Sequence, residues 1–143
     1  MIMNRSARLI KGLHVRESIT PVLIELHWLP IKARLIHKIC VMTNQALNYG
    51  KPKYIRDLLD DFSVNTEMAL RHSNVLHRLN EPRCNYEFGF RAFKNCAPRL
   101  YNKLPESVKN SDNIMIFKKK LKTYLFAECY DLEDMTIRQD YKC

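Results

Sequence analysis

The chain has 143 residues, 46% of them hydrophobic, with 24 lysines and arginines against 15 aspartates and glutamates. This length suits one domain with a sizeable core, and the composition excludes a wholly disordered chain. The formal net charge of +9 favours polyanionic partners such as nucleic acid, although net charge governs encounter rather than specificity. No run of about eighteen apolar residues is present, so we expect no membrane-spanning segment.

The cysteines are odd in number, widely spaced and without a C-x-x-C pair. They are Cys40, Cys84, Cys96, Cys129 and Cys143. With no secretory apolar region at the start, this pattern indicates reduced thiols in a nuclear or cytoplasmic protein that is not secreted.

The first 16 residues contain no acidic side chain, a composition also found in mitochondrial transit peptides. We favour a short helix here, with Leu9, Ile10 and Leu13 forming an apolar side that packs on the rest of the chain. Next, Thr20 and Pro21 are typical of a helix start, which predicts a helix over 21–28.

The stretch "HWLP" contains the only tryptophan and predicts an elbow between two helices. Pro30 moves Leu29 out of the helical region and can itself begin the following helix. Trp28 would fill the wedge between the helices. His27 could in principle be catalytic or bind metal, but no partner is suitably spaced, so we favour a structural role.

The longest helical pattern runs from Ile31 to about Asn48, where Gly50 suits a left-handed cap. Its expected buried stripe consists of Ile31, Leu35, Ile36, Ile39, Cys40, Met42, Ala46 and Leu47. A shorter helix is expected within 52–62, with one apolar side made of Tyr54, Ile55, Leu58, Leu59 and Phe62.

The middle of the chain has weaker periodicity. Residues 74–79 and 84–88 could pair as a small hairpin around a turn at 80–83. A helix follows, interrupted or restarted near Pro98, and Leu104-Pro105 forms a second elbow. Ser111 or Asp112 would cap a last helix, whose apolar stripe is Ile114, Phe117, Leu121, Tyr124 and Leu125.

These elements predict a mainly α, compact helical domain over residues 1–128, with room for a small β-hairpin in the middle. Residues 129–143 are polar and mixed in charge, and we expect them to fray.

Catalytic and metal-binding patterns are weak. Asp60-Asp61 has helical flanks rather than the turn that holds metal in reverse transcriptases, and His72, His77 and Cys84 are poorly spaced for zinc. A cysteine nucleophile with a histidine base would meet only in space, and nothing local supports one. With three glycines and no phosphate loop, we predict no catalytic residue, metal or cofactor.

Basic residues alternate with aromatic ones between Arg83 and Lys103, including Tyr86, Phe88, Phe93 and Tyr101, and a lysine cluster follows. Such a surface can neutralise phosphates and stack bases, although the aromatics could equally be core and the lysines merely solvated. The candidate nucleic-acid-binding residues are Arg83, Arg91, Lys94, Arg99, Lys103, Lys118, Lys119, Lys120 and Lys122.

Several motifs in order, over about residues 4–126, resemble the C-terminal region of non-LTR (LINE-type, jockey-like) retrotransposon reverse transcriptase polyproteins. The matching residues are His27, Trp28, Leu29, Pro30, then Arg91, Ala92, Phe93, then Ala97, Pro98, Leu100, Tyr101, Asn102, Leu104 and Pro105, followed by 117–126. Tyr101 stands where the family usually has Trp, and His72 where it usually has Ser.

The resemblance implies a segment that follows the polymerase domain and helps to hold RNA or DNA. The chain contains neither the polymerase palm nor an endonuclease, so those enzymatic activities cannot be transferred to it. We therefore expect a non-enzymatic, truncated tail that binds RNA or DNA weakly and without sequence specificity. The rival hypothesis is a protein-interaction fragment that packs against a reverse transcriptase domain.

Overall fold

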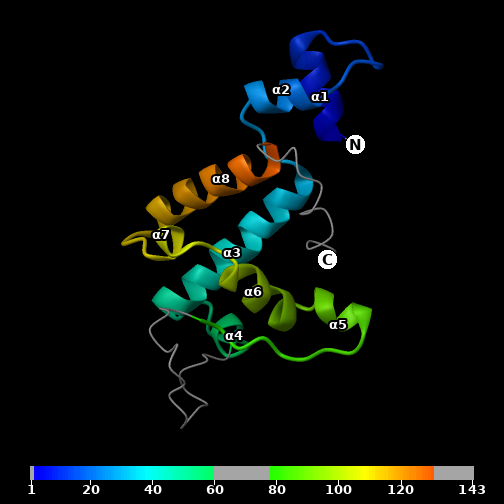
Figure 1. The fold of residues 1–143 in the computed structure, drawn as a ribbon. Helices are drawn as coiled ribbons and strands as arrows, with labels where there is room; N and C mark the ends of the chain where they lie inside the picture. The colour runs from blue at the N-terminus through cyan, green and yellow to red at the C-terminus, as the bar shows by residue number, and fades with distance from the viewer. Residues whose placement is uncertain (1, 60–77, 131–143) are drawn as a thin grey trace.

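The chain is mainly helical, as predicted. The computed structural model describes residues 2–59 and 78–130, and its helices are joined by short connections within each range (Figure 1). They are α1 (Ile2–Lys11), α2 (Thr20–Glu25), α3 (Ile31–Tyr49), α4 (Lys53–Arg56), α5 (Glu87–Arg91), α6 (Phe93–Asn102), α7 (Glu106–Lys109) and α8 (Ile114–Tyr130).

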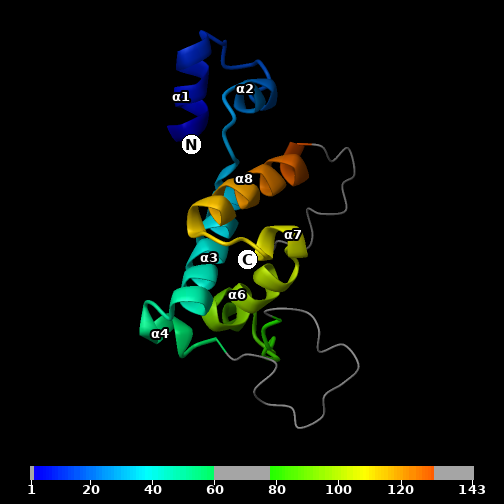
Figure 2. The ribbon, with the colours of Figure 1, turned by 90° about the vertical axis from the view of Figure 1, so that its left-hand side faces the viewer.

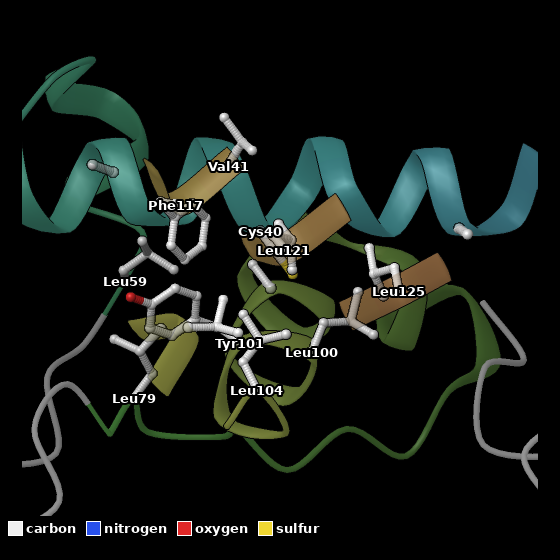
Figure 3. Packing of buried hydrophobic residues seen from close by; sticks show 14 of the residues in the cluster. Cys40, Val41, Leu59, Leu79, Leu100, Tyr101, Leu104, Phe117, Leu121 and Leu125 are labelled. Carbon is white, nitrogen blue, oxygen red and sulfur yellow. The ribbon is translucent and has the colours of Figure 1, made fainter. Parts of the chain in front are cut away.

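Helix α3 is the centre of the main core. Helices α6 and α8 both pack against it, and α4 folds back on its C-terminal end (Figures 1 and 2). Phe117 and Leu121 of α8 are fully buried with Tyr101 of α6, whose ring centroid lies 6.4 Å from that of Phe117 (Figure 3). This packing fixes α8 along α3, and the two helices therefore share one outer surface.

The apolar periodicity of residues 31–48 predicted helix α3 correctly. It predicted only part of the buried face of that helix. Ile36, Ile39, Cys40, Met42, Ala46 and Leu47 do face the core. Ile31 and Leu35 are exposed, and Ala33 is buried near the start of the helix instead. In α4, Ile55 and the following Leu59 are buried while Tyr54 and Leu58 are exposed; Phe62 lies outside the described residues.

The elbow after α2 is a Schellman cap. His27 has a left-handed backbone with φ of 50°. The Trp28 N–H donates to the Leu23 carbonyl at 2.8 Å, and the His27 N–H donates to the Ile24 carbonyl at 2.9 Å. Trp28 also packs in the same apolar cluster as Leu23, which is the hydrophobic contact this motif uses. Trp28 therefore has a structural role, as predicted, but it closes the end of α2 within the α1–α2 cluster and does not fill a wedge between α2 and α3.

The two Leu-Pro elbows have the same local structure. Pro30 and Pro105 both have extended ψ values, 155° and 149°, and each immediately precedes a helix, α3 and α7 respectively. Leu29 and Leu104, just before them, are both 5% exposed and belong to the main core. Each proline thus turns the chain while its preceding leucine anchors the turn.

Two hydrogen bonds with the half-buried Asn102 side chain hold Leu79 where the sequence allowed a hairpin. The Asn102 side chain accepts from the Leu79 N–H and donates to the Leu79 carbonyl, both at 2.9 Å. In the described part of the expected hairpin, Leu79 is an isolated bridge residue and residues 87–88 are helical, so no strand forms there. Residues 74–77 of the expected first arm lie outside the described residues.

Two local expectations, for α1 and for the helix around Pro98, were wrong. In α1, Ala7 is buried while Leu9 and Ile10 are exposed. The helix around Pro98 is continuous, and the break comes at Ala92, whose ψ is 139°.

The last helix is capped by Asn113, whose Oδ1 accepts from the Met115 N–H at 3.1 Å. Neither Ser111 nor Asp112, the residues expected from the sequence, occupies that position. Helix α8 continues to Tyr130, past the expected boundary at 128, and residues 131–143 lie outside the described part of the chain.

The residues that carry the family resemblance have different environments. Ala97, Pro98, Leu100, Tyr101 and Leu104 are buried in the main core, and Phe93 packs against it. Arg91 and Ala92 are exposed at the break between α5 and α6. Most of the matching residues between 91 and 105 therefore contribute to the core.

Candidate nucleic-acid interface

Helices α3 and α8 together hold seven of the 24 basic residues of the chain. Helix α3 contains Lys32, Arg34 and Lys38 and no acidic residue. Helix α8 contains four lysines and one acid, Glu128, which accepts a hydrogen bond from the Tyr124 hydroxyl at 3.0 Å. The pair of helices therefore has a formal net charge of +6.

His37 marks the line where the two helices meet. Its Nε2 donates to the Lys118 carbonyl at 3.4 Å, a long contact across 81 residues of sequence. Burial lowers the pKa of His37, and the charges of Lys118 and Lys122 add to this effect. His37 is therefore neutral at pH 7, and the positive charge along this junction comes from the lysines and Arg34.

Arg34 is held at the N-terminal end of the same junction. Its Nε donates to the Leu29 carbonyl at 3.1 Å, and its Cζ lies 5.9 Å from the centroid of the Trp28 ring. Burial raises the pKa of Tyr130, at the end of α8, and the charge of Arg34 opposes that rise. Arg34 is therefore close enough to α8 to act electrostatically on it.

We call Arg34, Lys38, Lys118 and Lys122 the α3–α8 basic face. Arg34, Lys38 and Lys122 are exposed and Lys118 is half-buried. Cations spaced along two packed helices can neutralise successive phosphates of a nucleic-acid backbone.

The four α8 lysines predicted to bind nucleic acid lie on different sides of the helix. Lys118 and Lys122 are on the flank that meets His37. Lys120 is on another flank, where its Nζ donates to the Ser107 carbonyl at 3.0 Å. Lys119 is exposed. Sequence reasoning missed Arg34 and Lys38, because they join the lysines only through helix packing.

The remaining candidates lie on α5, on α6 and among the residues that flank these two helices. Arg83, Arg91, Lys94 and Lys103 are exposed, and Arg91 pairs with Glu87 at 3.2 Å. Arg99 is half-buried, with its Cζ 5.7 Å from the centroid of the Phe90 ring. The structure thus does not bring the nine predicted residues onto one surface.

The aromatic residues that alternate with these basic residues are also of two kinds, buried and exposed. Tyr101 is fully buried and Phe93 packs on the core, so neither ring can stack on a base. Tyr86 and Phe88 are 78% and 85% exposed, respectively. Only this last pair retains the stacking role that the sequence suggested.

The described residues offer little for metal or nucleophilic chemistry. Residues 2–59 and 78–130 contain no group of three or more His, Cys, Asp or Glu side chains placed to hold a metal ion. Burial raises the pKa of Cys40 to about 12, which makes its thiol a poor nucleophile. Asp60, Asp61, His72 and His77 lie outside the described residues.

Within those same ranges, no helix has both the length and the apolar character needed to cross a membrane. Comparison with protein-family models, curated protein sequences and solved structures gives no match.

Proposed function

We propose that this chain is a non-enzymatic C-terminal segment of a non-LTR retrotransposon reverse transcriptase protein, and that it binds the phosphate backbone of RNA or DNA through the α3–α8 basic face. The family half of the proposal is supported by the ordered motifs, whose residues build the Schellman elbow and the α6 core. The binding half is supported by the charge on α3 and α8.

One observation carries the binding proposal: two helices packed side by side hold seven basic residues and one acid. The acid is hydrogen-bonded to Tyr124, and the histidine at the junction is neutral at pH 7. Within α3 and α8 themselves, the basic residues can therefore attract a polyanion without a competing free carboxylate.

The test is a pair of charge-matched double variants. Lys38→Gln/Lys122→Gln removes two exposed cations from the α3–α8 basic face, and Lys51→Gln/Lys53→Gln removes two exposed cations next to α4. Both lower the net charge by the same amount. We expect the first to weaken binding to labelled duplex DNA and to reduce the salt slope by about 2, since each lost phosphate contact lowers it by about 1.

The control variant should change the salt slope by less than half as much. Equal losses in both variants, measured by fluorescence anisotropy on chains with unchanged circular dichroism, would show that binding depends on net charge alone. That result would contradict the assigned face.

A second candidate function is docking against a reverse transcriptase domain. It is favoured by the exposed apolar side chains of α1, since Ile2 and Leu9 are both 85% exposed and Ile10 is 58% exposed. An isolated chain that sediments as a well-behaved monomer would count against it.

A further inference from the structure

The segment from Arg83 to Lys94 presents two large rings to solvent. Tyr86 is 78% exposed and Phe88 is 85% exposed, whereas aromatic side chains usually contribute to a core. We call this pair the aromatic platform. It lies among the basic candidates on and beside α5 and α6, none of which belongs to the α3–α8 basic face.

The backbone under the platform is held in place. The Asn95 side chain donates to the Gly89 carbonyl at 2.7 Å, and the Gly89 N–H donates to the Tyr86 carbonyl at 3.0 Å. A Cβ at Gly89 would lie 2.0 Å from the Cys84 Sγ, so a larger residue there would force the Cys84 side chain to move. These contacts fix the backbone that carries both rings.

The charges beside the rings favour an anionic ligand. Arg83, Arg91 and Lys94 are exposed and close to the two rings in the sequence, and Glu87, the acid between the rings, pairs with Arg91. An apolar protein partner would need the rings but would gain nothing from Arg83 and Lys94. Unpaired nucleotides use both features, because each offers a flat base and a phosphate.

We infer that the aromatic platform binds single-stranded RNA or DNA by stacking unpaired bases on Tyr86 and Phe88, with Arg83 and Lys94 beside the backbone. A duplex cannot use this site, since its base faces are already stacked on each other. The inference deepens the proposed function and depends on it only for the class of ligand. It assigns strand selectivity to a surface other than the one proposed to grip the backbone.

The experiment compares ring variants of the full chain on two labelled probes, a single-stranded DNA of about 15 nucleotides and the same strand annealed to its complement as a blunt-ended duplex. Tyr86→Ala/Phe88→Ala should weaken single-strand binding by about 25-fold or more, because stacking on each ring is worth roughly fivefold or more. Duplex binding should stay within about twofold, since the α3–α8 basic face is intact.

Two further variants control for lost apolar area and for folding. Tyr49→Ala/Tyr54→Ala removes two other exposed rings, 52% and 68% exposed, and should leave single-strand binding unchanged. Tyr86→Phe/Phe88→Tyr keeps both flat rings and should retain wild-type affinity. A 2-aminopurine base placed in the single strand should also lose fluorescence on binding to the wild-type chain.

The outcomes separate this inference from the proposed function. Single-strand affinity that survives Tyr86→Ala/Phe88→Ala, while duplex binding still depends on Lys38 and Lys122, overturns the platform alone. Ring-dependent single-strand binding without lysine-dependent duplex binding overturns the backbone site and supports the platform. A folded wild-type chain that binds neither probe overturns both.

Discussion

Lys109 is the most buried basic residue in the described part of the chain, with 5% of its surface exposed. Its Nζ donates to the Asn102 carbonyl at the end of α6 at 3.1 Å and lies 5.5 Å from the centroid of the Tyr101 ring. Burial lowers its pKa, which is opposed by the charge of Glu106. A cation at the carboxyl end of a helix is well placed to stabilise it, so Lys109 joins α7 to α6.

Replacing this lysine by an apolar residue of similar length should therefore destabilise the fold. We expect Lys109→Met to lower the free energy of unfolding by about 1–2 kcal/mol, because the Asn102 carbonyl loses its charged donor. The matched change at exposed Lys119 should cost less than about 0.5 kcal/mol. Urea denaturation of both variants measures the two free energies of unfolding. Equal values would show that the Lys109 ammonium does not stabilise the fold.

At the scale of elements, the long helices were predictable and the short contacts between them were not. The pattern of 31–48 gave α3 to within a residue, because a stripe repeated over five turns is hard to mistake. In α1, Ala7 lies in the buried cluster with Leu23 of α2, and the larger Leu9 points outward. Sequence hydropathy ranks leucine above alanine, so it could not anticipate a close approach made through a small residue.

The sequence predicted that the candidate site would be basic, but it did not predict which residues form it. The lysine cluster of α8 was visible in the sequence, but Arg34 and Lys38 lie some 80 residues away and reach it only through α3–α8 packing, as the His37–Lys118 contact shows. Likewise, nothing in the spacing of Phe93 and Tyr101 separated these buried rings from the exposed Tyr86 and Phe88. Tertiary packing decides both questions.

The cap of α8 gives an element-scale prediction. Asn113 accepts the Met115 N–H with its side chain, and its carbonyl accepts the Phe117 N–H at 2.9 Å. Asn113→Ala should lower the free energy of unfolding by about 1 kcal/mol, the usual cost of a lost N-cap. Asp112→Ala, at the neighbouring exposed position, should cost less. The reverse order in thermal or urea unfolding would show that the sequence-based choice of Asp112 was correct.

At the scale of the whole molecule, basic residues occur on several elements. Helices α3 and α8 hold seven of the 24 basic residues, and α1 holds three more, of which Lys11 contacts Glu25. What distinguishes α3 and α8 is that these two helices pack against each other, so their cations can act on one ligand. A polyanion should therefore be attracted to this pair of helices before any contact forms.

The most direct test of this account is a salt titration of the wild-type chain against labelled duplex DNA. If the four cations of the α3–α8 basic face each neutralise a phosphate, the logarithm of the association constant should fall with the logarithm of salt concentration at a slope of about −3 to −4. Salt-independent binding, or no binding at low salt by a chain shown to be folded, would contradict a backbone-binding role for this face.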